Sequence, residues 1–469
     1  MELSKLDIKS AKEGLEKKEF SAVELVTSCL EQIKKKDPGL NAFITICEQE
    51  ALKQAEGVDK QFSNLAIEQL SNLPLLGIPI AIKDLFCTKG IRTTAGSKVL
   101  EDYVPVYDAT VVERLKKAGA IIIGKTNMDA WGHGSSGENS DFGPTRNPWN
   151  PEYVSGGSSS GSAAAIASDM CLAACGTDTG GSIRLPASFC NVVGLKPTYG
   201  RVPRYGVISM ASSLDSIGHL TKNVYDSALM LNLTAGWDGK DATCPKQEVP
   251  DYTKGLENGT KGLKIGVPKE YFVQGISPEV KRKTEEAVAI LEKLGAQIID
   301  VSLPHTKYGI AAYYLIQSSE VSSNLARFDG IRYGNGRDKF GDEAKRRIML
   351  GTYALSAGYY DQYYLKAQKV RTLIKADFDN AFKSCDLLIA PISPTLPFKI
   401  GEKTDDPLQM YLSDIFAVTT NLAGIPGLSV PIGFENGLPV GIQLSGPQFS
   451  EELLFKAGYA LEQEQNVEK

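Results

Sequence analysis

Histidine, tryptophan and long hydrophobic runs are scarce in this sequence. Its 469 residues include 3 His and 3 Trp, and apolar runs such as residues 120–123 are far shorter than the roughly 20 residues of a membrane helix. Charged side chains interrupt residues 1–20, so we expect no signal peptide, no membrane span and a cytoplasmic protein. The dispersion of His133, His219 and His305 argues against histidine as a general base.

The sequence also lacks a metal-binding cysteine pattern. It has 8 Cys, and Cys171 and Cys175 are close, but no CxxC pair or histidine cluster accompanies them. In a chain without a secretion signal, cysteines are expected to stay reduced. We therefore predict buried, small apolar thiols in place of a zinc site, and no metal in this protein.

Charge and composition are those of an ordinary globular protein. The chain carries 51 Lys+Arg against 56 Asp+Glu, a net charge of −5, with 42% hydrophobic and 23% charged residues. A protein that binds nucleic acid alone needs a concentrated basic face, so this mild acidity disfavours that class while allowing a partner to bind RNA. The length fits about three units of roughly 150 residues or one large α/β domain.

Hydrophobic periodicity predicts alternating strands and helices. Ser21 and Glu24 form a capping-box signature, and a hairpin signal surrounds residues 435–437. We predict helices over residues 21–36, 108–118, 277–294 and 451–463, and strands over 78–82, 120–123, 263–267, 297–301, 387–390, 428–434 and 438–444. No repeat or linker divides the chain, so we expect one domain over 1–469, with a helical segment over about 1–70, a glycine-serine core over about 75–225 and a central mixed sheet.

Two glycine- and serine-rich segments stand out, at residues 156–162 and 178–182. A flexible linker could have this composition, but apolar segments at 163–167 and 170–174 favour a structured site. Neither segment ends in the Gly-Lys-Ser/Thr of a phosphate-binding loop, and both lack the G-x-G-x-x-G dinucleotide pattern. The G-x-S-x-G elbow of lipases is absent as well.

An oxyanion-binding site fits residues 178–182 better than a phosphate-binding loop does. The amides of Thr179, Gly180 and Gly181 can point the same way, because glycine adopts unusual backbone angles freely. Ser182 then follows as a nucleophile, and with histidine scarce its base is a lysine. Lowering a lysine pKa from about 10.4 to near 7 costs roughly 4–5 kcal/mol, which burial supplies. Lys83, at the end of an apolar run, is the candidate; an ordinary surface lysine at a strand end is the alternative.

These segments resemble the signature of the amidase signature family. The resemblance extends over nearly the whole chain and is carried by residues 77–84, 142–149, 156–162, 178–184 and 194–198. It implies an α/β fold, a single large domain whose central mixed β-sheet is covered by helices on both faces. It also implies amide-bond chemistry.

Transferred residue by residue, the resemblance makes Ser182 the nucleophile and Lys83 the base. Ser158 becomes the bridging serine, which in this family follows a cis peptide bond. The neighbouring Ser159, Ser160 and Ser162 are expected to form the turn. Two positions depart from the family pattern: Ser160 replaces a common third glycine, and Leu185 replaces a glutamine that often follows the arginine.

A narrower resemblance concerns the A subunits of tRNA-dependent aspartyl/glutamyl amidotransferases, which are glutaminases. It is carried by residues 134–140, 318–330, 345–352, 411–416 and 421–427. It implies a heterotrimer with B and C subunits, with no cofactor in the glutaminase itself. The B subunit would use ATP and Mg²⁺ and bind the aminoacyl-tRNA. The tRNA served would be Glu-tRNA(Gln), Asp-tRNA(Asn) or both.

Glutamine is a zwitterion, so its recognition pairs a cation with the α-carboxylate and an anion with the α-ammonium. The resemblance gives these roles to Arg347 and Asp414, with Gly134 and an aromatic hydroxyl beside them. Tyr313 is preferred over Tyr314 for that hydroxyl. The structural alternatives are a helix-surface arginine for Arg347 and a helix cap for Asp414.

Two rival functions stay open. A stand-alone amidase acting on fatty, aryl or peptide amides would need a hydrophobic acyl channel in place of the charged pair. A non-catalytic scaffold with the same fold would be expected to have lost Lys83, Ser158 or Ser182, and all three are present.

Overall fold

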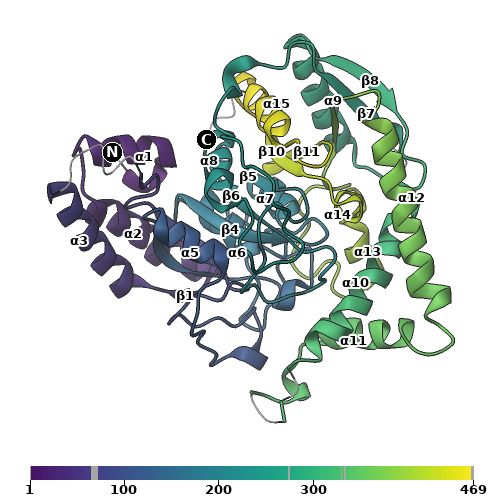
Figure 1. The fold of residues 1–469 in the computed structure, drawn as a ribbon, viewed down its shortest axis with the longest axis horizontal. Helices are drawn as coiled ribbons and strands as arrows, with labels where there is room; N and C mark the ends of the chain where they lie inside the picture. Colours follow the sequence, from purple (N-terminus) through teal and green to yellow (C-terminus); the bar gives the residue numbers. More distant parts are fainter. Residues whose placement is uncertain (1, 65–71, 273–274, 329, 332–333, 466–469) are drawn as a thin grey trace.

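Eleven strands form one mixed sheet in the computed structural model, which describes residues 2–64, 72–272, 275–328, 330–331 and 334–465 (Figure 1). Their order is β1-β3-β2-β4-β6-β5-β10-β11-β9-β7-β8. The strands are β1 (Phe43–Ile46), β2 (Pro79–Lys83), β3 (Ile121–Thr126), β4 (Ala173–Asp178), β5 (Val193–Lys196), β6 (Ser216–Thr221), β7 (Lys264–Pro268), β8 (Gln297–Val301), β9 (Leu387–Pro391), β10 (Gly427–Glu435) and β11 (Leu438–Ser445).

The sheet combines parallel and antiparallel pairs, as predicted. Strand β2 runs parallel to β3 and β4, and β7 runs parallel to β8 and β9. The remaining neighbours, including the predicted β10–β11 hairpin, are antiparallel. The expected mixed sheet is therefore confirmed.

Helices flank this sheet, which confirms the predicted α/β class. Helices α5, α8, α15 and α9 contact one another in that order, and α6 contacts α7. Helix α8 packs on β5 and β6, α15 and α9 on β10 and β11, α6 on β2, β3 and β4, and α7 on β5, β10 and β11. The α-helices are α1 (Ile8–Glu16), α2 (Ala22–Leu40), α3 (Glu48–Asn64), α5 (Thr110–Lys117), α6 (Ser160–Ala167), α7 (Arg184–Cys190), α8 (Val224–Thr234), α9 (Pro278–Lys293), α10 (Gly309–Leu325), α11 (Asp342–Ala354), α12 (Lys366–Ala381), α13 (Pro407–Leu412), α14 (Val418–Ala423) and α15 (Glu451–Glu464).

The predicted elements are present, with bounds shifted by a few residues. The capping box at Ser21 and Glu24 opens α2, which continues past the predicted end through Pro38 and stops where Asn41 turns left-handed. The helical segment predicted over about 1–70 also contains a strand, β1, which pairs with β3 at the edge of the sheet. Its residues 65–71 lie outside the described part of the chain.

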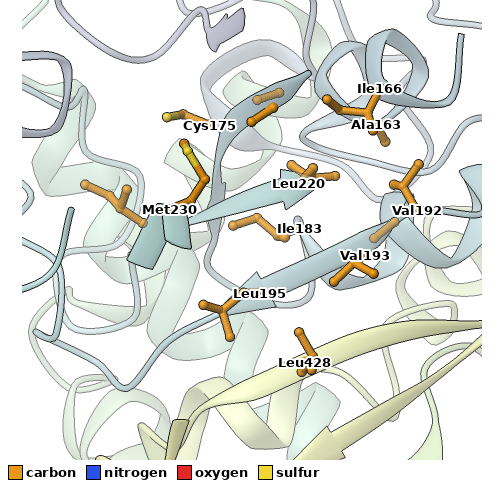
Figure 2. Packing of buried hydrophobic residues seen from close by; sticks show 14 of the residues in the cluster. Ala163, Ile166, Cys175, Ile183, Val192, Val193, Leu195, Leu220, Met230 and Leu428 are labelled. Carbon is orange, nitrogen blue, oxygen red and sulfur yellow. The ribbon is translucent and has the colours of Figure 1, made fainter. Parts of the chain in front are cut away.

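The core joins both faces of the sheet into one apolar cluster. Figure 2 shows part of it, with Ile166 of α6, Cys175 of β4, Leu220 of β6, Met230 of α8 and Leu428 of β10, all essentially inaccessible to solvent. All eight cysteines are free thiols and seven are buried, so the predicted role as small apolar residues is confirmed. No described helix is both long enough and apolar enough to cross a membrane.

The topology explains how distant segments meet. Strands β2 and β4 are parallel neighbours, with Ile82 opposite Cys175. Their carboxyl ends therefore lie at the same edge, which places Lys83 beside the segment that follows β4. Helix α6 begins at Ser160 and packs on both strands, so the first glycine-serine segment reaches the same place.

Candidate active site

Lys83 ends β2 as a fully buried side chain. Its Nζ donates to Ser158 Oγ at 2.8 Å, to Ser159 Oγ at 3.0 Å and to Thr177 Oγ1 at 2.9 Å. All three acceptors are hydroxyl oxygens and none is a carboxylate. Lys83 is thus not the surface lysine of the structural alternative, and it lies in contact with the predicted bridging serine.

The protonation state of Lys83 follows from this environment. Burial lowers the pKa of Lys83 to about 7, against the opposing charges of Asp129, Asp178 and Asp215, which favour the protonated form. Desolvation disfavours the charged form of a lysine. A substantial fraction of Lys83 is therefore neutral at pH 7 and able to accept a proton.

Ser158 and Ser182 belong to two adjoining loops. The Gly157–Ser158 peptide bond is cis, as the resemblance implied, and the next residue is tied to the nucleophile loop because Ser159 N–H donates to Ser182 C=O at 3.0 Å. Ser158 is 1% exposed and Ser182 is 8% exposed. The Ser182 hydroxyl forms no hydrogen bond with any described residue, which leaves it available to a substrate.

Ser159 and Ser162, two of the serines predicted to form the turn, use their hydroxyls in hydrogen bonds to other segments. Ser159 lies in the turn before α6, as expected, and its hydroxyl also accepts from Lys83 Nζ and donates to Thr177 C=O at 3.1 Å. The expectation is wrong for Ser162, which lies inside α6 and donates its hydroxyl to Cys175 C=O at 3.0 Å.

The predicted oxyanion amides differ in their availability. The N–H of Gly181 donates to Asp178 Oδ1 at 2.9 Å, so it is occupied in this structure. The N–H groups of Thr179, Gly180 and Ser182 find no acceptor within the described part of the chain. Gly180 faces a tight space, because a Cβ there would lie 2.5 Å from Tyr313 Oη.

A buried ion pair that the sequence reasoning missed holds this loop. Arg184 donates from Nε to Asp178 Oδ2 and from Nη2 to Asp178 Oδ1, each at 3.0 Å. Asn421 Nδ2 adds a bond to Asp178 Oδ1 at 2.9 Å. Burial opposes the charge of Asp178, but the Arg184 guanidinium holds its pKa well below the usual range. The sequence does carry one sign of this ion pair: Asp178 and Arg184 stand on either side of Ser182, between the end of β4 and the start of α7.

A charged cavity of about 190 Å³ lies between the segment that contains Gly134, helix α11 and the segment that contains Tyr411. Arg347 of α11 and Gly134 line it, and Arg347 is 2% exposed. A surface arginine is therefore excluded for this position. Asp414, 7% exposed, accepts a hydrogen bond from Tyr314 Oη at 3.4 Å. Burial raises the pKa of Asp414 to about 7, while bonds from Ser135 and Tyr314 and the charge of Arg347 favour its ionised form.

The two tyrosines of α10 have different neighbours. Tyr314 lies between the charged residues, with the Arg347 guanidinium carbon 5.2 Å from its ring centre and its hydroxyl on Asp414. Tyr313 faces the nucleophile loop instead, beside Gly180. Tyr313 therefore lies against the loop that carries Ser182, whereas Tyr314 lies against Asp414, and the substrate contact of Tyr313 stays a prediction.

His133 is a further buried residue, to which the sequence reasoning gave no role. It precedes Gly134, and neither ring nitrogen has a partner among the described residues. Burial, and then the charge of Arg347, hold the pKa of His133 well below the usual range. It is a neutral ring next to the charged cavity, and nothing links it to Lys83 or Ser182.

A neutral lysine beside one serine, a second serine with a free hydroxyl and unoccupied amides are the groups that nucleophilic attack on a carbonyl uses, and comparison with known proteins identifies the family. The family model described as Amidase matches residues 24–455. This chain belongs to the amidase family. A relative from Geobacter metallireducens, the A subunit of a glutamyl-tRNA(Gln) amidotransferase, is 54% identical over 479 residues, covering 99% of this chain and 98% of the relative.

Solved amidase structures share the whole fold. The structure of the glutamyl-tRNA(Gln) amidotransferase A subunit from Thermotoga maritima is 44% identical, with a TM-score of 0.84 over 99% of this chain and 96% of that chain. A bacterial aryl acylamidase of the amidase signature family is 28% identical, with a TM-score of 0.86 over 98% of this chain and 96% of that chain. Amidases that act on different substrates therefore share this fold. The fold does not identify the substrate of this chain, which has to be inferred from the residues of the cavity.

The two departures from the amidase signature pattern are accommodated locally. Ser160 donates its hydroxyl to Thr145 Oγ1 at 3.2 Å. Leu185 lies in a small apolar cluster with Val154 and Phe189. Neither side chain contacts Lys83, Ser158 or Ser182 through a hydrogen bond, so both changes leave the predicted proton-transfer groups in place.

Proposed function

We propose that this amidase is the glutaminase component of a tRNA-dependent amidotransferase, which releases ammonia from glutamine. The observation that carries the proposal is the pairing of a buried cation, Arg347, which lines the charged cavity, with a buried acid, Asp414; Tyr314 contacts both side chains. An amide with a hydrophobic acyl group offers no partner to either charge, whereas free glutamine offers both.

In the proposed cycle, Ser182 Oγ attacks the side-chain carbonyl carbon of glutamine. Its proton passes through Ser158 to neutral Lys83, and free amides of residues 179–182 stabilise the oxyanion. The carbon–nitrogen bond then breaks, and Lys83 returns the proton through Ser158 to the leaving ammonia. Water attacks the glutamyl ester along the same proton path, giving glutamate and free Ser182.

The proposal extends to an assembly. A cytoplasmic heterotrimer with B and C subunits would pass the ammonia to the B subunit, where ATP and Mg²⁺ activate the side-chain carboxylate of Glu-tRNA(Gln) or Asp-tRNA(Asn). No cofactor is proposed for the glutaminase itself, because its reaction needs only proton transfer and a nucleophile. The name shared by the Geobacter and Thermotoga relatives supports this assembly.

Steady-state hydrolysis of L-glutamine, butanamide and an aryl amide by the full chain tests the proposal. A clear preference for glutamine in kcat/KM is expected. A preference for either uncharged amide would instead favour a stand-alone amidase. Purification of the tagged chain from native lysate, followed by identification of its stoichiometric partners, tests the assembly separately.

A further inference from the structure

We infer that Glu343 is a positioning residue for glutamine recognition, because it fixes the orientation of the Arg347 guanidinium. The inference rests on the proposed function and adds a residue to it. Glu343 and Arg347 stand four residues apart on α11, and their side chains are 11% and 3% exposed. An ion pair this buried is held in one geometry more firmly than an exposed helix pair.

The hydrogen bond between them uses one edge of the guanidinium. Arg347 Nε donates to Glu343 Oε1 at 2.7 Å. Within the part of the chain that the structure describes, no other N–H of this guanidinium donates a hydrogen bond. Nη1 and Nη2 therefore stay available, and together they offer the two parallel donors that a carboxylate accepts in a bidentate pair. Glu343 orients the arginine without occupying its carboxylate-binding end.

The rings of Tyr411 and Tyr314 connect Glu343 to the buried acid, Asp414. Tyr411 Oη donates to the same Glu343 Oε1 at 3.0 Å, and its ring stacks on Tyr314 with centres 3.8 Å apart. Tyr314 in turn donates to Asp414. A continuous set of contacts thus runs from Glu343 to Asp414, and it fixes how far apart the cation and the anion lie.

The charge of Glu343 also compensates for burial. Desolvation opposes the charge of Arg347, yet Glu343 is the largest of the influences that raise its pKa above the ordinary value. Among the described residues, Tyr411 and Arg346 are the other groups that form hydrogen bonds with the Glu343 carboxylate. Loss of the carboxylate would leave the guanidinium free to reorient toward the tyrosine rings on either side.

Three full-chain variants test the inference: Glu343→Ala, Glu343→Gln and the control Asp379→Ala. Glu343→Gln keeps an oxygen that accepts from Arg347 Nε and Tyr411 Oη. Asp379 forms an exposed pair with Lys375, also four residues apart on one helix, and its replacement should be neutral. The substrates are L-glutamine, glutaramate, which keeps the carboxylate but lacks the ammonium group, and butanamide, which lacks both.

Glu343→Ala should raise KM for glutamine and glutaramate about tenfold or more, with kcat and butanamide hydrolysis within about twofold. Glu343→Gln should recover most of that loss, and Asp379→Ala should match the unmutated chain. The inference is overturned if Glu343→Ala leaves both KM values unchanged, if butanamide suffers equally, or if Glu343→Gln is as damaging as Glu343→Ala. Failure of the unmutated chain to prefer glutamine would instead overturn the proposed function.

Discussion

Lys83 Nζ lies 2.8 Å from Ser158 Oγ, although 75 residues separate them in the chain. The contact depends on the parallel pairing of β2 with β4 and on α6, whose first turn follows Ser158. Lysine can act as a base here only if it loses its proton, and its burial among hydroxyls lowers its pKa for that purpose. The position therefore requires a side chain that can become neutral.

Lys83→Arg should be nearly as damaging as Lys83→Ala, with both reducing kcat for glutamine by at least about a thousandfold. Arginine keeps the positive charge but stays protonated, so it cannot accept the serine proton. Steady-state rates of both variants, with circular dichroism as the folding control, provide the measurement. Substantial activity in the arginine variant would mean that Lys83 supplies charge and not basicity.

The pH dependence of hydrolysis should reflect two groups. Lys83 must be neutral, so activity should fall as the pH drops below its pKa of about 7. Asp414 must be ionised to hold the substrate ammonium, and its pKa is also about 7. The kcat/KM profile should therefore rise more steeply with pH for glutamine than for butanamide, which needs only Lys83. A flat profile for butanamide between about pH 5.5 and 8.5 would contradict the neutral-lysine mechanism.

Much of this site is predictable from the sequence because short motifs determine it. The apolar run before Lys83 left a surface lysine as an alternative, which the resemblance to the amidase signature family argued against, and the glycines before Ser182 predicted available amides. The occupied amide of Gly181 was not predictable, since its acceptor, Asp178, is held in place by Arg184 folding back onto it. An ion pair within one turn can face solvent or the core, and the sequence does not distinguish them.

Strand β1 and the burial of Arg347 were also not predictable, because both depend on contacts with segments distant in the sequence. Strand β1 has four residues between two helices, too few for a clear alternation, and it forms because β3 offers a free edge. Arg347 belongs to a Lys-Arg-Arg run typical of a solvated helix face. Its burial depends on the stacked tyrosines Tyr314 and Tyr411, which come from two other segments.

Ser182→Ala should abolish glutamine hydrolysis and any tRNA amidation that depends on glutamine. Amidation driven by added ammonia should persist in the assembled complex, because the variant removes only the source of ammonia. The assay compares the two nitrogen donors with the same preparation. Loss of the ammonia-driven reaction in a folded, assembled variant would show that Ser182 is not a dedicated glutaminase nucleophile.

Arg184→Ala should destabilise the whole protein. Removing one partner of a buried ion pair leaves the other charge unpaired, which costs about 3–5 kcal/mol. Here Asp178 would keep only its bonds to Asn421 and to loop amides. Urea unfolding should show the loss, whereas Lys375→Ala, in an exposed pair, should change stability by less than about 1 kcal/mol. Equal effects of the two variants would refute a structural role for the Arg184 pair.

Arg347→Ala and Asp414→Ala should each raise KM for glutamine strongly while leaving butanamide hydrolysis nearly unchanged. Both side chains are more than nine-tenths buried, so each truncation should leave one charge of the bound zwitterion unpaired away from solvent, at a cost of about 2–5 kcal/mol. Butanamide never makes either contact, so the nucleophile, the base and the oxyanion amides should still act on it. The two variants should also differ in their effect on glutaramate hydrolysis. Glutaramate has only the carboxylate, so it should be affected by Arg347→Ala and much less by Asp414→Ala. Equal losses on glutamine, glutaramate and butanamide would instead indicate that the side chains support the fold or the catalytic loop, and the charged cavity would then not be the glutamine site.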